Sequence, residues 1–262
     1  MYYLSIITVA YNNKDGLIRT RDSILPLPDN CEWIIIDAAS TDGTKEEILE
    51  KLPIQDNIKW TSEPDKGIFD GMNKGIDIAK GQYLNFMNSG DYYNRSAFLK
   101  IIESEPHDAD MIMYDCITID KNDNRGYARQ FPSNIDEIKD WACVQHQSAL
   151  INKKVFELLG KYSLKYKYLS DYEHSVRAYL DKQIFFSLNK SVKLSYFSLD
   201  GVSTNAQTLT TVMTEYKNIQ KKYFGTFSKK LYLLHLIKLV IGFLPQNELI
   251  VKFVKKIFLR KR

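Results

Sequence analysis

The stretch Tyr83-Leu84-Asn85-Phe86-Met87-Asn88-Ser89-Gly90-Asp91 decides the fold. Its first residues are mostly large and apolar, which predicts a buried strand, and it ends abruptly in small and acidic residues. In open α/β sheets, ligands bind at the carboxyl ends of the strands. Gly90 lets the backbone approach a ligand closely, and Asp91 can hold a hard cation through oxygen. The same pattern also fits a strand followed by an ordinary Asx-type turn.

Three more strand-like runs precede this stretch, and a helical pattern follows each of them. The runs cover 4–9, 33–37 and 58–61, and the longest helical pattern covers 67–80. The second run is almost wholly apolar, as expected of a strand that helices cover on both faces. Strands that alternate with helices predict an α/β fold with a mostly parallel, doubly wound sheet.

The second half of the chain continues with shorter elements. We expect a helix near 95–104, a strand at 110–114, a hairpin turn at 120–126, a short helix at 155–159 and strands at 184–187 and 192–196. Ser170 and Glu173 have the spacing of a capping box, as do Thr44 and Glu47. The box at Ser170 would place Asp171 in the first turn of a helix, at the positive end of its dipole.

Composition bounds the protein class. The chain has 262 residues, enough for one large domain or for one domain with an appendage. Its three cysteines have no paired spacing, so neither a zinc site nor a disulfide framework is indicated, and a reducing compartment fits. The first residues lack a basic region and a cleavage site, so they are expected to form a first strand and not a signal peptide.

The formal net charge of +4 hides a division along the chain. Residues 217–262 contain twelve Lys or Arg and one acid, a net charge of +11, which leaves −7 on residues 1–216. The apolar positions within 250–258 repeat with a helical period, and lysines occupy the other face. The run 231–244 is too short to span a bilayer. We therefore expect a helical tail that meets an anionic membrane surface, and no nucleic-acid partner. Packing of the apolar stripe on the domain or on a second subunit stays open as the alternative.

Two common nucleotide-binding motifs are missing from the sequence. No G-x-G-x-x-G follows the first strand, and no G-x-x-x-x-G-K-[ST] occurs anywhere. Their absence argues against a dehydrogenase and against a P-loop enzyme.

An ordered set of motifs instead resembles the family-2 glycosyltransferases, which have the GT-A fold. The set consists of the first strand with its Tyr-Asn, the residues from Asp37 to Thr44, the segment 63–75, and the segment 79–91. A thinner resemblance follows at His146-Gln147-Ser148, Gly160, 170–173 with Arg177, and 201–203. The set is similar to the branch that builds bacterial surface polysaccharides. It implies a GT-A domain over 1–205, followed by the basic tail at 206–262.

The resemblance also implies roles for individual residues. Asp171 corresponds to the general base, and Asp91 to a ligand of Mn²⁺ or Mg²⁺. His146 and Gln147 would lie on the acceptor side. The nucleotide sugar would contact Val9, Tyr11, Asp37, Asp65, Lys66, Asp70, Asn73, Asn88 and Ser89.

The chain departs from the family pattern at two positions. Ala38 stands where many members have an acid that reads the nucleobase, so base recognition falls to Asp37, Tyr11 or the backbone. Gly90 stands where the Asp-x-Asp motif has its usual metal-binding second Asp, which leaves Asp91 to hold the ion directly or through water. Each of these polar residues could also serve only the fold, as a strand end, a helix cap or a buried histidine.

The expected activity is that of a hexosyltransferase. It would move a sugar, with inversion, from a nucleotide donor such as a UDP-sugar to a hydroxyl of a saccharide acceptor, which we expect to be lipid-linked. The protein would be cytoplasmic and peripheral on the inner face of the cell membrane. Two alternatives stay open: a sugar-nucleotide pyrophosphorylase, which should have a glycine-rich basic loop after the first strand, and a catalytically inactive glycan-binding or membrane-surface scaffold, which Gly90 makes plausible.

Overall fold

The computed structural model describes residues 2–52, 55–104, 108–120, 125–128, 131–198 and 208–228. The chain divides into two compact units, Met1–Asp200 and Gly201–Arg262. The boundary predicted after residue 205 falls outside the described residues.

The first unit is built on a nine-stranded sheet of order β3-β2-β1-β4-β8-β6-β9-β5, with β7 paired to β6. Neighbouring strands from β3 to β4 are parallel, whereas β8 runs antiparallel to both β4 and β6. The sheet is therefore mixed but mostly parallel, as the sequence predicts. The strands are β1 (Leu4–Ala10), β2 (Cys31–Asp37), β3 (Ile58–Ser62), β4 (Tyr83–Phe86), β5 (Tyr92–Tyr93), β6 (Met111–Asp120), β7 (Arg125–Ala128), β8 (Ala149–Asn152) and β9 (Phe186–Ser198).

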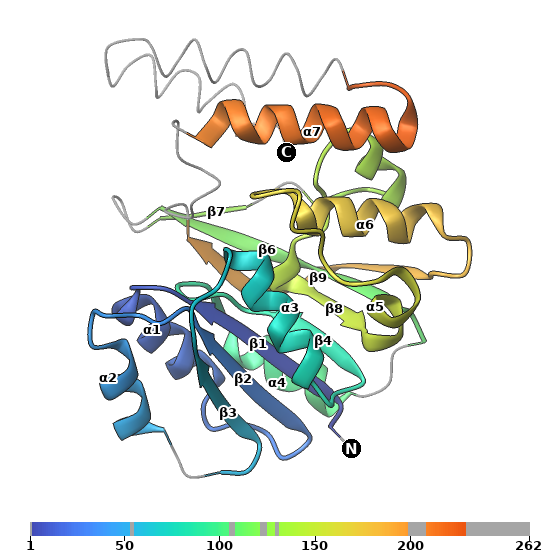
Figure 1. Ribbon diagram of the computed structural model, residues 1–262. Helices are drawn as coiled ribbons and strands as arrows, with labels where there is room; N and C mark the ends of the chain where they lie inside the picture. The colour runs from blue at the N-terminus through green and yellow to red at the C-terminus, as the bar shows by residue number, and fades with distance from the viewer. Residues whose placement is uncertain are drawn as a thin grey trace. The chain divides into compact units, whose positions relative to one another are not determined.

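Helices cover both faces of this sheet. Buried side chains of α1 (Lys14–Ile24) and α4 (Arg95–Glu103) join one core cluster with alternate residues of β1 and β2, such as Ile6 and Trp33. On the other face lies α3 (Ile68–Ile78), which crosses in front of the central strands in Figure 1. The remaining helices of the unit are α2 (Thr44–Lys51), α5 (Lys153–Leu159) and α6 (Ser170–Leu180), with short 3₁₀ turns η1 (Ile135–Lys139) and η2 (His146–Ser148).

Two glycines let α3 approach β1 closely. A Cβ added at Gly75 would lie 2.4 Å from a methyl carbon of Ile7, and one added at Gly71 would lie 2.7 Å from Val9. Contacts this short leave no room for a larger residue, because core packing is already close to that of a crystal. The Gly-x-x-x-Gly spacing in α3 thus sets the height of the helix above the strand.

Two strands of the sheet differ from those predicted from the sequence. β8 has only four residues and follows the short turn η2, so it carries no usable periodicity. The two strands expected at 184–187 and 192–196 form one long strand, β9, which has a register irregularity against β6 near Asp115. The predicted hairpin is confirmed by the antiparallel pair β6–β7.

The described part of the second unit contains α7 (Leu209–Phe224), which ends at Gly225 with a positive φ. The apolar stripe predicted within 250–258 lies outside the described residues. Among the residues that the structure describes, no helix has the length and apolar character needed to cross a bilayer.

Candidate active site

The carboxyl ends of β1 and β2 meet at one edge of the sheet, where their following loops are tied together. The backbone N–H of Asn12 donates to Ser40 Oγ at 2.8 Å, and the N–H of Thr41 donates to Asn12 Oδ1 at 2.8 Å. Asn12 has a φ of 45°, a left-handed conformation that asparagine tolerates better than most residues. Beside this junction, the side chain of Tyr11 is 65% exposed and free to stack on a planar ligand.

Asp37, at the end of β2, is fully buried. Its carboxylate accepts hydrogen bonds from the hydroxyl of Ser62 at 2.6 Å and from the hydroxyl and backbone N–H of Ser40. These bonds fix the turn after β2 and compensate the burial of the charge. The predicted contact of Asp37 with a base or ribose stays a prediction, and it would need one of these bonds to be shared.

Three of the residues predicted to contact the nucleotide sugar lie at the start of α3. Asp65 Oδ1 accepts from the N–H of Gly67 at 2.8 Å, and Asp70 Oδ2 accepts from the N–H of Lys66 at 3.0 Å. Both acids therefore order the turn that leads into the helix, and their carboxylates lie at its positive end. The side chain of Lys66 is exposed at the same turn, where it can meet an anion.

Asn73, on α3, contacts the loop after α5. Its amide exchanges two hydrogen bonds with the backbone of Tyr162, at 2.9 and 3.0 Å. Both polar ends of the side chain thus pin the loop after α5 onto α3. In this structure the amide holds that loop with one N–H and one lone pair, which leaves a second of each. The contact of Asn73 with the nucleotide sugar stays a prediction.

The segment Asn88–Asp91 continues from β4 at the same edge. The N–H of Ser89 donates to the carbonyl of Val9 at 3.1 Å, and Asn13 Nδ2 donates to the carbonyl of Ser89 at 3.0 Å. From α1, the hydroxyl of Thr20 donates to the carbonyl of Asp91 at 2.7 Å and accepts from the N–H of Gly90 at 3.1 Å. The sequence gives no local signal for Thr20 or Asn13, because their targets lie about seventy positions away along the chain.

Gly90 has a φ of 106°, a conformation that side chains disfavour. The acid that the family carries at this position would be strained on this backbone. The departure from Asp-x-Asp therefore matches the shape of the loop and leaves Asp91 as the carboxylate that closes it.

The oxygen ligands at this edge fit a divalent cation that binds together with a phosphate-containing substrate. Mg²⁺ sites of nucleotide-using enzymes often contain one or two carboxylates, with phosphate oxygens and water supplying the other ligands. The residues that the structure describes include no cluster of three or more His, Cys, Asp or Glu placed to hold an ion alone. Asp91, 7% exposed, would supply one protein oxygen, and a diphosphate and water the other ligands.

Asp171 lies in the first turn of α6, as predicted, but the predicted capping box is wrong. The hydroxyl of Ser170 donates to the carbonyl of Ser163 at 2.8 Å. The carboxylate of Glu173 instead accepts from Nε of Arg177 at 3.0 Å, one turn further along. The box predicted at Thr44 is wrong as well, since Gly43 precedes α2 and the hydroxyl of Thr44 donates to the carboxylate of Asp42, which also accepts from the backbone N–H of Thr44 at 3.1 Å.

His146 joins Asp171 to the end of β4. Asn88 Nδ2 lies 3.0 Å from His146 Nε2, and His146 Nδ1 lies 3.2 Å from Asp171 Oδ2. The side chains of His146 and Asp171 are about one-fifth exposed, at 19% and 21%. One continuous hydrogen-bonded line therefore joins Asn88, predicted to contact the nucleotide sugar, to His146, predicted to contact the acceptor, and to Asp171, the predicted base.

Gln147 does not fit the acceptor-side role predicted for it. Its side chain is fully buried, whereas its neighbour His146 reaches the site. The 3₁₀ turn η2 points successive side chains in different directions, so only one of the two can face an acceptor.

Behind Asp171, α6 also carries a buried histidine. His174 is fully buried and stacks on Phe156, with ring centroids 4.4 Å apart. Burial, with a smaller contribution from the positive charge of Arg177, lowers the pKa of His174 from 6.5 to about 3. The imidazole is therefore neutral at physiological pH.

This burial predicts a dependence of stability on pH. Between about pH 6.5 and about pH 3 the unfolded chain binds a proton at His174 that the folded chain does not, so stability falls as the pH falls. The slope from one such group is at most about 1.4 kcal/mol per pH unit. We expect His174→Leu to lose less stability than the wild type between pH 8 and pH 4.5 in urea unfolding. Equal losses in the two proteins would contradict a neutral buried His174.

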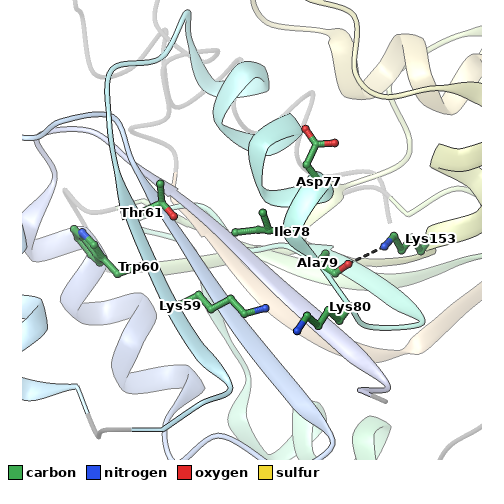
Figure 2. A pocket seen from close by; sticks show the side chains of 8 residues that line it. All are labelled: Lys59, Trp60, Thr61, Asp77, Ile78, Ala79, Lys80 and Lys153. Atoms are coloured by element: carbon green, nitrogen blue, oxygen red, sulfur yellow. Dashed lines mark hydrogen bonds between the residues drawn. The ribbon is translucent and has the colours of Figure 1, made fainter.

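A separate pocket of about 750 Å³ lies between β3, the end of α3 and the start of α5 (Figure 2). None of the predicted site residues lines it. Two of its lysines already have partners, since Lys59 pairs with the buried Glu32 at 2.7 Å and Lys153 donates to the carbonyl of Ala79 at 2.8 Å. The pocket is lined by Lys59, Trp60, Thr61, Asp77, Ile78, Ala79, Lys80 and Lys153.

Comparison with known proteins identifies the family of this chain. The model of Glycosyl transferase family 2 matches residues 5–169. A PGL/p-HBAD biosynthesis glycosyltransferase of Mycobacterium bovis is 25% identical over 178 residues, which are 66% of this chain and 67% of the relative. The Escherichia coli UDP-Glc:alpha-D-GlcNAc-diphosphoundecaprenol beta-1,3-glucosyltransferase WfaP is 38% identical over 94 residues, or 36% of this chain and 37% of that protein.

Solved structures agree on the fold. Staphylococcus aureus TarS 1–349 in complex with UDP-GlcNAc has a TM-score of 0.62 at 15% identity, covering 85% of this chain and 71% of that one. The mannosyltransferase PcManGT of Pyrobaculum calidifontis, in complex with GDP-Man and Mn²⁺, has a TM-score of 0.58 at 14% identity, covering 80% and 61%. The GT-A fold predicted from the sequence is thereby confirmed.

Proposed function

The chain belongs to glycosyl transferase family 2, whose members transfer sugars from nucleotide donors, and we propose that it moves a sugar from a UDP-sugar to a hydroxyl of a lipid-linked saccharide, with inversion. The observation that carries this proposal is the line from Asn88 through His146 to Asp171, which sets one carboxylate beside the sheet edge where Asp91 lies. One base and one leaving-group site suit a single displacement at the anomeric carbon.

The reaction makes three demands on these residues. The nucleotide is held at the edge formed by β1 and β2, where Tyr11 offers an exposed ring for the base. The acceptor oxygen bonds to the anomeric carbon as the bond to the diphosphate breaks, and the diphosphate leaves with the electron pair. Asp171 takes the proton of the acceptor hydroxyl, which becomes acidic only as the new bond forms.

Charge grows on the leaving diphosphate during this step. Lys66 is exposed at the start of α3 and offers a positive charge near the edge. A divalent cation held by Asp91 would, when bound, neutralise part of the same charge. The Mn²⁺ complex of the Pyrobaculum mannosyltransferase supports the presence of such an ion.

The choice of uridine rests on the relatives, and a binding experiment tests it. TarS is in complex with UDP-GlcNAc, and the name of WfaP gives UDP-Glc as its donor. We expect UDP to raise the melting temperature in the presence of Mn²⁺, and GDP to raise it less, because a ligand that binds only the folded state stabilises it. A catalytically inactive scaffold would show no Mn²⁺-dependent shift with any nucleotide, and a larger shift with GDP would overturn the choice of base.

A lipid-linked acceptor requires the protein to reach a membrane, and we propose that the basic tail provides the contact. The tail carries a net charge of +11 over 217–262, and polybasic helices bind anionic lipid surfaces. We expect the full-length protein to float with anionic vesicles at about 0.15 M salt, where the Debye length is about 8 Å. Replacing Lys252, Lys255 and Lys256 by Gln should weaken this binding and leave UDP binding unchanged. Failure of the wild type to float would remove the proposal.

A further inference from the structure

The line Asn88–His146–Asp171 carries a further inference about how the base is held. Its three members come from separate parts of the unit: the end of β4, the turn η2 and the first turn of α6. The two hydrogen bonds use both ring nitrogens of His146. The backbone carbonyl of His146 also accepts from Asn85 Nδ2 at 3.1 Å, which anchors η2 to β4. The imidazole is therefore held at both ring nitrogens, and the backbone of His146 is held by β4.

The chemistry of the partners determines which nitrogen of His146 bears the proton. An ionised carboxylate only accepts hydrogen bonds, so Nδ1 must donate to Asp171. In a neutral ring, Nε2 then has a lone pair and needs a donor. Asn88 supplies one through Nδ2. The pairing thus sets one tautomer, and the second nitrogen of a histidine is commonly oriented by such a partner.

This arrangement gives a reason for asparagine at position 88, where the family's motif begins with an acid. An aspartate there would accept from Nε2 and leave either a bare Nδ1 against Asp171 or a doubly protonated ring between two carboxylates. Asn88 Oδ1 is buried and has no hydrogen-bond partner within the described part of the chain.

We propose that His146 is a positioning residue, which holds the carboxylate of Asp171 through Nδ1–H and ties it to the donor edge through Asn88. The inference rests on the proposed function, in which Asp171 is the base. It replaces the acceptor contact predicted for His146 from the sequence.

Two matched substitutions separate the two bonds of the ring. In His146→Asn the amide nitrogen can occupy the place of Nδ1, so the donor to Asp171 is kept and the contact with Asn88 is lost. In His146→Gln the amide reaches the place of Nε2, so the contact with Asn88 is kept and the donor to Asp171 is lost. Loss of a hydrogen bond to a charged group should lower kcat of the Gln variant on the order of 10- to 100-fold.

The separate effects on kcat and on the KM for the acceptor distinguish a positioning role of His146 from direct binding of the acceptor. We expect the Asn variant to keep most of the wild-type kcat, and both variants to keep the wild-type KM for the acceptor and Kd for UDP with Mn²⁺. A raised acceptor KM with unchanged kcat in either variant would overturn the proposal and restore the acceptor contact. Equal loss of kcat in both variants, with unchanged melting temperatures, would also overturn it.

A spectroscopic measurement tests the geometry without any activity. The chain has four histidines, and comparing ¹⁵N-labelled wild type with His146→Gln identifies the signals of this ring. At pH 8 we expect a proton on Nδ1 of His146 and none on Nε2. A proton on Nε2, alone or together with Nδ1, would contradict the proposal. If the tautomer is as expected and no nucleotide sugar is turned over, the proposed function fails while the orientation of Asp171 stands.

Discussion

Asp171→Asn should lower the rate of sugar transfer by about 10²–10⁴-fold, the usual contribution of a positioned general base. The amide keeps the shape of the side chain and can still meet His146, but it loses the negative charge and the basicity that remove the acceptor proton. Binding of the sugar nucleotide should survive, because the proposed nucleotide site comprises Tyr11 and Asp91 and includes no residue of α6. Transfer rates with saturating donor, together with calorimetric Kd values for UDP, measure the two effects separately.

The matched control for this variant is Glu173→Gln, the same change of acid to amide two residues along α6. Glu173 is buried and pairs with Arg177, whose guanidinium also holds carbonyls of the loop after α5, including that of Lys161 at 2.8 Å. We expect this variant to lose stability, because it removes one charge of a buried pair, and to keep kcat near that of the wild type. An inactive Gln variant beside an active Asn variant would assign the base to Glu173 instead.

Asp91→Asn should abolish the Mn²⁺-dependent part of UDP binding and most of the transfer. The substitution removes the charge that offsets a divalent ion beside a diphosphate, and a neutral amide is a weaker ligand. The backbone of the loop should keep its place, since the hydroxyl of Thr20 binds the carbonyl of Asp91 and not its carboxylate. Titration of UDP with and without Mn²⁺, for wild type and variant, measures this loss.

Asp77→Asn provides the corresponding control. Asp77 lies at the surface on α3, where its side chain is 59% exposed and pairs with Lys161. Surface pairs of this kind contribute little to stability. We expect this variant to bind UDP and Mn²⁺ as the wild type does. Retention of metal-dependent binding in Asp91→Asn would mean that another group holds the ion.

The first four strands were predictable because their signal is local. The runs in β1 and β2 are almost wholly apolar, and β4 ends abruptly at Asn88-Ser89-Gly90-Asp91, so periodicity and punctuation both mark the sheet edge. Parallel topology then brings the ends of β1, β2 and β4 together without further information. Tyr11 and Asp91 could therefore be placed at one edge from the sequence alone.

The remaining features depend on contacts between distant residues. Ser170 and Glu173 have the spacing of a capping box, but Ser163 and Arg177 are better placed partners in the folded chain. The bonds of His146 to Asn88 and Asp171 cross 58 and 25 positions of sequence, and no spacing rule reaches so far. The burial of Asp37 likewise depends on Ser62 in the neighbouring strand.

Sugar transfer can be measured directly. Full-length protein is incubated with a panel of nucleotide sugars, Mn²⁺ and a lipid-linked saccharide extract, and the released nucleoside diphosphate and the lengthened acceptor are measured. We expect release of UDP from at least one UDP-sugar, with one sugar added to the acceptor for each UDP released, and near-complete loss of both in Asp171→Asn. Transfer only from donors other than UDP-sugars, or equal transfer by Asp171→Asn, would contradict this expectation.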